Sequence, residues 1–171
     1  NTFIGMIQNN AVYGLLAIAE MLVIITGGID ISIGAILAFV GGVTTRYMSE
    51  HMEWPSFIWV LLALAVGLLC GMLNGVLVGY LHIVPMIATL GTMYISRGLA
   101  FLISGGKWWM PHQIAESYQN WAVQKFIGIP AIIWILVILF VVFGFFLSMT
   151  THGRRIYAIG TSRESSAVAG I

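Results

Sequence analysis

Long runs of apolar residues, separated by short polar stretches, make up most of the chain. A helix needs about twenty consecutive apolar residues to cross the hydrocarbon core of a bilayer. Five segments approach or exceed that length, at residues 11–26, 31–47, 57–80, 85–103 and 129–149. We therefore expect an all-α fold, a polytopic membrane helix bundle in which residues 1–171 are part of one transmembrane domain.

The short join between the first two segments departs from this pattern. Residues 27–34 read Gly-Gly-Ile-Asp-Ile-Ser-Ile-Gly, with an acid and a serine where hydrocarbon would otherwise continue. Irregular backbone at membrane depth survives only where it is buried in protein or lines a wet cavity, and transporters place such breaks beside their pathways. The pattern predicts a broken helix around Gly27–Gly34. Asp30 can cap the next helix by accepting backbone N–H bonds. It can also contact a polar substrate together with Ser32, and the two roles can coexist.

The third segment carries glycines at a regular spacing. Gly67, Gly71, Gly75 and Gly79 recur every four residues, and small residues at that spacing favour the close approach of another helix. Asn74 lies beside this stripe. An amide in hydrocarbon must find a partner, so Asn74 either makes an interhelical hydrogen bond or lies on a pathway.

The fourth segment has a polar face. Thr89, Thr92 and Ser96 lie three and four residues apart, which places their hydroxyls on one side of a helix. Arg97 lies well inside the segment, and an intramembrane arginine is by default a functional hypothesis with a partner to be named. Glu20 is the only other charge placed equally deep, so it is one candidate partner.

Composition narrows the function classes. The chain is 60% hydrophobic and 8% charged, its mean hydropathy is +0.99, and its net charge of +1 argues against nucleic acid as a partner. The four histidines are scattered without metal-ligand spacing, and no Walker A pattern is present. We expect no enzyme, no metal and no cofactor, with membrane lipid as the main solvent.

Basic residues predict the orientation. Arg154, Arg155 and Arg163 form the densest basic cluster, and loops rich in Lys and Arg stay in the cytoplasm. Counting back from this cluster makes loops 104–128 and 48–56 external, and it puts loop 81–84 and the glycine break on the cytoplasmic side.

These motifs resemble the inner-membrane permeases of bacterial sugar ABC importers of the ribose, xylose and galactose type. The resemblance rests on residues 27–34, on Asn74–Val78, on Pro85–Met93 and on Arg97–Gly98. It implies a fragment of a larger permease in a bacterial cell membrane, translocating a monosaccharide. It also implies three protein partners: an ABC ATPase subunit that binds ATP, an extracytoplasmic sugar-binding protein, and a second permease subunit in a homo- or heterodimer. The pathway candidates are Asp30, Ser32, Asn74, Thr89, Thr92, Ser96 and Arg97.

The last twenty residues, 152–171, extend the resemblance. Thr161 followed by Glu164 fits a capping box, which predicts a short amphipathic cytoplasmic helix, and a solvated loop is the other reading. In members of the family, the corresponding stretch looks like the coupling helix that docks into the ATPase subunit. That role is carried over to Gly160, Glu164, Ala167, Gly170 and Ile171.

Two alternative functions stay open at this point. Residues 105–108, Gly-Gly-Lys-Trp, are similar to a stretch in permeases for the autoinducer-2 signal, which makes that molecule the second candidate substrate. An ion-coupled secondary transporter is the other alternative, with Glu20 and Arg97 as relay residues.

Overall fold

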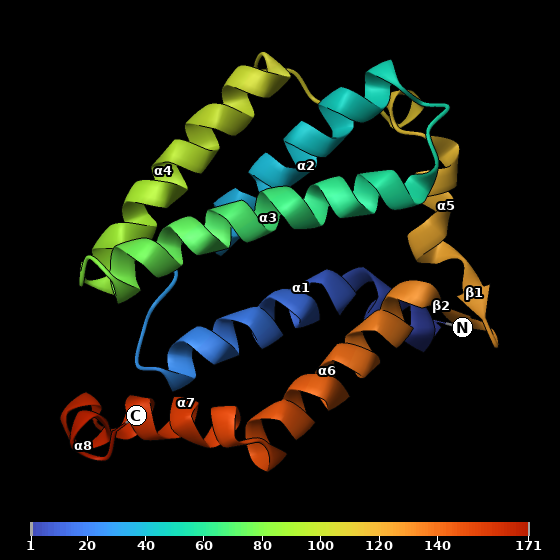
Figure 1. Ribbon diagram of the computed structural model, residues 1–171. Helices are drawn as coiled ribbons and strands as arrows, with labels where there is room; N and C mark the ends of the chain where they lie inside the picture. The colour runs from blue at the N-terminus through green and yellow to red at the C-terminus, as the bar shows by residue number, and fades with distance from the viewer. Residues whose placement is uncertain (1, 171) are drawn as a thin grey trace. The chain divides into compact units, whose positions relative to one another are not determined.

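The structure is a computed structural model that describes residues 2–170, and most of these residues are helical (Figure 1). The expected all-α fold is therefore confirmed. The longer helices are α1 (Thr2–Ile25), α2 (Ile33–Glu50), α3 (Ser56–Gly79), α4 (Pro85–Ser104) and α6 (Ala131–Met149). The shorter elements are η1 (Pro111–Gln113), α5 (Glu116–Val123), α7 (Thr151–Thr161), α8 (Arg163–Val168) and an antiparallel pair of two-residue strands, β1 (Lys125–Phe126) and β2 (Ile129–Pro130).

Among the described residues, four helices are long and apolar enough to cross a membrane. They are Phe3–Ile25, Ser56–Gly79, Pro85–Ser104 and Ala131–Met149. The eighteen-residue α2 is not one of them, and it carries Arg46 and Glu50 near its end. That segment 31–47 spans the membrane therefore stays a prediction.

The predicted break between the first two segments is present. The first helix ends at Ile25 and the second begins at Ile33. Gly27 has a φ of +77°, and the amides of Gly27 and Gly28 donate to the carbonyls of Ile24 and Val23 at 2.9 and 3.0 Å. This is the left-handed glycine ending of a helix. It explains why the chain cannot continue as one straight span.

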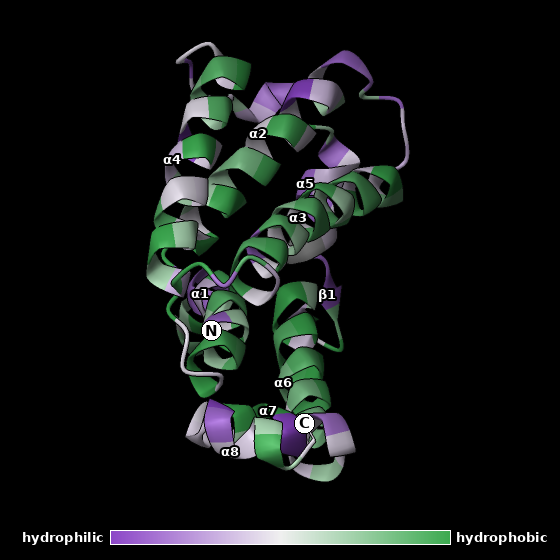
Figure 2. Cartoon of the chain, turned by 60° about the vertical axis from the view of Figure 1, so that its left-hand side comes forward, coloured by the Kyte–Doolittle hydropathy of each residue, from purple (hydrophilic) through white to green (hydrophobic). Residues whose placement is uncertain are grey.

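The chain forms two compact units and passes from one to the other twice, once inside this break and once between residues 122 and 123. One unit contains the residues up to 29 and those from 123 onward, and the other contains residues 30–122. In the first unit, α1 packs against α6, and α7 packs against α1. Figure 2 shows α6 as hydrophobic along its length, whereas α7 and α8 carry several hydrophilic residues.

In the second unit, α2 packs against α3 and, more extensively, against α4 (Figure 1). A small core joins the end of α2 to the start of α3 and the segment before α5. It consists of Met48, Trp59 and Ala115, each at most 4% exposed. The amide of Ala115 donates to the sulfur of Met48 at 3.3 Å, so this segment is fixed against α2.

The glycine stripe of α3 was expected to pack closely against another helix, and the structure shows no such contact among the described residues. A Cβ added at Gly71, Gly75 or Gly79 would meet no heavy atom within 4 Å, and one at Gly67 would meet only Val40. Within residues 2–170, then, no helix packs closely on the stripe. Close packing of another helix on the stripe stays a prediction, because spacing alone does not say whether the partner helix lies in the same chain.

Candidate functional site

Four of the seven predicted pathway residues lie together where the second unit begins. An oxygen of the Asp30 carboxylate accepts hydrogen bonds from the backbone N–H and the hydroxyl of Ser32, at 2.7 and 2.6 Å. Ser32 is fully buried and is the N-cap residue of α2. Asp30 therefore accepts a hydrogen bond from a backbone N–H at the start of α2. The donor is the N-cap residue Ser32, so Asp30 holds Ser32 in place.

Asn74 links this turn to α3. Its side-chain nitrogen donates to the Ser32 hydroxyl oxygen at 2.9 Å, which is the interhelical hydrogen bond that one interpretation of the sequence predicted. Asn74 is 8% exposed, and its oxygen Oδ1 is buried without a hydrogen-bond partner among the described residues. An unpaired buried acceptor costs about 1–3 kcal/mol, so burying this atom without a partner is destabilising.

Thr89 links the same turn to α4. Its hydroxyl oxygen accepts a hydrogen bond from the amide of Ile31 at 3.2 Å, and Thr89 is 3% exposed. The irregular backbone at residues 30–32 is thus held from α3 by Asn74 and from α4 by Thr89. We call Asp30, Ser32, Asn74 and Thr89 the break cluster.

The other three pathway candidates lie further along α4. Thr92 and Ser96 are buried, and the Thr92 hydroxyl donates to the Thr89 carbonyl of its own helix at 3.1 Å. Arg97 is exposed, and no ion pair to it is found in the described part of the chain. It lines a groove of about 450 Å³ together with Gly41, Gly42 and other residues of α2 and α4.

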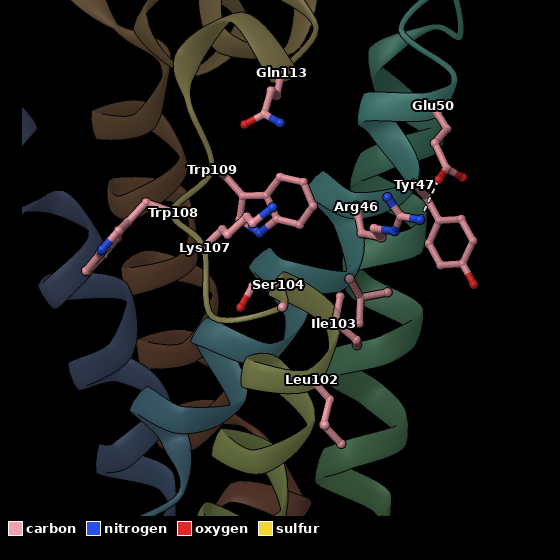
Figure 3. Close-up of a pocket in the computed structure, with 12 residues that line it drawn as sticks. Arg46, Tyr47, Glu50, Leu102, Ile103, Ser104, Lys107, Trp108, Trp109 and Gln113 are labelled. Atoms are coloured by element: carbon pink, nitrogen blue, oxygen red, sulfur yellow. Dashed lines mark ion pairs between the residues drawn. The ribbon is translucent and has the colours of Figure 1, made fainter.

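A pocket at the far end of α2 and α4 was not predicted from the sequence. It has a volume of about 800 Å³, and its lining includes Arg46, Glu50, Lys107, Trp109 and Gln113 (Figure 3). Arg46 and Glu50 form an ion pair, with 2.7 Å between Nη2 and Oε1. Arg46 belongs to the predicted segment 31–47, whereas the other four residues lie in the stretches 48–56 and 104–128, which the pattern analysis treated as loops. The cluster Gly-Gly-Lys-Trp at 105–108 was the one signal of it.

The C-terminal segment corrects one prediction. The capping box with Thr161 as N-cap is wrong, because Thr161 is the last residue of α7 and Ser162 caps α8. The Ser162 hydroxyl accepts from the amide of Ser165 at 3.2 Å, so Glu164 does not occupy the third position of the helix. Residues 151–168 form two short helices rather than one, because Thr150 caps an earlier start by accepting from Gly153 at 3.0 Å.

The coupling candidates divide into two groups. Glu164, Ala167 and Gly170 are exposed on or just after α8, and Ile171 lies outside the described residues. Gly160 belongs to α7, and a Cβ added there would fall on the carbonyl oxygen of Ile25 at the end of α1. The lack of a side chain at Gly160 therefore serves a contact within this chain.

Comparisons with known proteins show that the chain is similar in sequence to several import permeases. The fructose import permease protein FruF of Bifidobacterium longum is 38% identical over 171 residues, which cover 98% of this chain and 47% of that protein. The ribose import permease protein RbsC of Haemophilus influenzae is 30% identical over 100% of this chain and 53% of its own length. The autoinducer 2 import system permease protein LsrC of Photorhabdus luminescens is 32% identical over 92% of this chain and 46% of its own length. No solved structure matches significantly.

The chain spans about half the length of the curated relatives it matches. A family model described as "Branched-chain amino acid transport system / permease component" matches residues 3–171. That match covers almost the entire chain, so the chain belongs to this family of transport-system permease components, which are membrane proteins and not enzymes by themselves.

Proposed function

We propose that the chain is part of the membrane permease subunit of an ATP-driven importer that translocates a monosaccharide across a bacterial cell membrane. The observation that carries this proposal is the break cluster, in which the half-buried Asp30 and the buried Ser32, Asn74 and Thr89 form a polar site at the ends of helices. Polar groups are expensive at membrane depth and mark pathways. The names of the fructose and ribose relatives supply the substrate class.

The α2–α4 pair is the favoured location of the pathway. Buried hydroxyls of Thr89, Thr92 and Ser96 run along α4, and Arg97 opens onto a groove beside α2. By contrast, the groove between α1 and α6 is lined by apolar residues and glycine. Sugar hydroxyls need hydrogen-bond partners when they leave water, so a route along α2 and α4 suits them better.

ATP hydrolysis would occur in a separate ABC ATPase subunit. The exposed, small residues Ala167 and Gly170 make α8 the favoured docking element for that partner. The contact of Gly160 with the end of α1 would pass a displacement of α7 to the residues just before the break. An external sugar-binding protein and a second permease subunit complete the proposed assembly.

The test is uptake by the full-length permease in liposomes with its ATPase and binding protein. We expect uptake of fructose or ribose that requires ATP and is insensitive to an uncoupler. Uptake that needs no ATPase and collapses with an uncoupler would indicate the secondary transporter instead. Autoinducer 2 and leucine are the competing substrates. One relative is named for autoinducer 2, and leucine is one of the branched-chain amino acids that the family description names. Transport of either of these without sugar transport would reject the monosaccharide.

A further inference from the structure

The pocket at the far end of α2 and α4 has the chemistry of a carbohydrate site. We propose that it binds a monosaccharide, with the sugar ring on Trp109 and the hydroxyls at the Arg46–Glu50 pair and Lys107. This inference rests on the proposed function and adds a second site to it, at the opposite end of the α2–α4 pair from the break cluster. Its volume of about 800 Å³ lies within the range of small-molecule sites.

The ion pair supplies both kinds of hydrogen-bonding group. Arg46 offers only donors and Glu50 only acceptors, and their side chains remain 51% and 48% exposed. A sugar hydroxyl both donates and accepts, so neighbouring hydroxyls can bridge the pair without breaking it. A zwitterionic amino acid would have to separate Arg46 from Glu50 to match both charges, and this favours a polyol over an amino acid.

Trp109 supplies an aromatic face. Figure 3 shows Trp109 pointing toward Arg46, whereas the neighbouring Trp108 points away from it. Trp108 is 89% exposed. The C–H face of a sugar packs well on an indole, since the indole ring is large and rigid and its face is apolar. The indole N–H of Trp109 is buried and has no hydrogen-bond partner within residues 2–170, so packing alone fixes the ring.

Trp109 also connects the pocket to the proposed pathway. Trp109 and Ser104 line both the 800 Å³ pocket and the groove that contains Arg97. A ligand on Trp109 would therefore lie next to the groove along α2 and α4. On the predicted orientation this end of both helices is external, which makes the pocket an entry site.

Ligand protection of a thiol tests the site in the full-length permease in nanodiscs. Ser104→Cys places a reporter in the pocket, and Cys70→Ala removes the native thiol. We expect fructose or ribose to slow maleimide labelling of the Ser104→Cys protein. The exposed His112→Cys, which does not line the pocket, is the control whose labelling should not change.

Paired tryptophan variants then test the ring contact. Trp109→Ala should raise the half-protecting sugar concentration about tenfold, which corresponds to the worth of one good aromatic contact. Trp109→Phe should recover part of that loss. Trp121→Ala removes an exposed tryptophan that does not line the pocket, and it should have no effect. An equal effect of Trp121→Ala, or protection by leucine and not by sugar, would overturn the inference.

The two proposals can fail separately. If the permease imports sugar with ATP but neither sugar protects the Ser104→Cys thiol, the pocket is not a sugar site and the proposed function stands. If no sugar is imported and none protects, both proposals fail.

Discussion

Ser32 is the residue on which the hydrogen bonds of the break converge. It donates to Asp30 and accepts from Asn74, and it is fully buried. The sequence could predict that these polar side chains need partners, because an unpaired polar group in a low-dielectric interior is costly. It could not predict which partners they take, because Ser32 and Asn74 are 42 residues apart and helical periodicity does not fix the register between helices.

Ser32 and Asn74 should therefore be energetically coupled. Ser32→Ala leaves the Asn74 amide without its hydrogen bond, whereas Asn74→Ala leaves Ser32 still bound to Asp30. We expect Ser32→Ala to be the more destabilising change. The double variant should be less unstable than the sum by about 0.6 kcal/mol, the average coupling measured for interhelical hydrogen bonds in membranes.

Thermal unfolding of the detergent-solubilised full-length permease measures this coupling. Thr92→Val is the matched control, because the Thr92 hydroxyl donates to a carbonyl of its own helix and its loss should show no coupling to Asn74→Ala. Strict additivity of Ser32→Ala and Asn74→Ala would mean that the hydrogen bond contributes nothing.

At the scale of elements, the long apolar helices were predictable and the short ones were not. Pro85 begins α4, as the sequence indicated. Proline suits the first position of a helix because the N–H that it lacks would have no acceptor within the helix there. The elements between residues 111 and 130 are too short to show a period. The boundary between α7 and α8 depends on which of two adjacent hydroxyl residues, Thr161 or Ser162, acts as the cap. The capping-box pattern favoured Thr161, whereas Ser162 is the cap.

The contact of α7 with α1 makes Gly160 a sensitive position. A methyl group in Gly160→Ala would overlap the carbonyl of Ile25, so α7 must move away from the end of α1. We expect lower thermal stability and reduced transport. Gly144→Ala in α6 is the control, since a Cβ there meets nothing within 4 Å and alanine favours helix by about 0.5–1 kcal/mol.

The comparison is made by melting temperature and sugar uptake of the two variants at equal expression. Equal values for Gly160→Ala and Gly144→Ala would show that α7 does not rest on α1 in the working permease.

At the scale of the whole molecule, composition and hydrophobic pattern were enough for the fold class and the membrane environment. They did not show that the chain forms two compact units, with one of the two boundaries in the glycine break. That division depends on which helices pack together, and α1 packs with α6, which lies more than a hundred residues later in the chain. The loops beyond α2 and α4 were read as connections, so the pocket around Trp109 was missed.

The orientation of both units in the membrane can be tested with single cysteines in the Cys70→Ala background. Glu53, His112 and Ser165 are exposed positions outside the long helices. The basic cluster at Arg154, Arg155 and Arg163 predicts that Ser165→Cys is cytoplasmic. It follows that Glu53→Cys and His112→Cys should react with an impermeant maleimide in right-side-out vesicles, and Ser165→Cys only in inside-out vesicles.

The same experiment decides whether α2 spans the membrane, since its hydropathy leaves this open. If α2 crosses the membrane, Ile29→Cys before it should label from the cytoplasmic side and Glu53→Cys after it from the outside. Ile29 is 55% exposed, so reagent can reach it. Labelling of both from the same side would leave α2 as a helix that does not span. That result would contradict the packing of α2 along α4, because α4 is a candidate span that carries Thr89 of the break cluster near its start and Ser104 of the pocket at its end. The break cluster and the pocket could then not be the two ends of a transport route along α2 and α4.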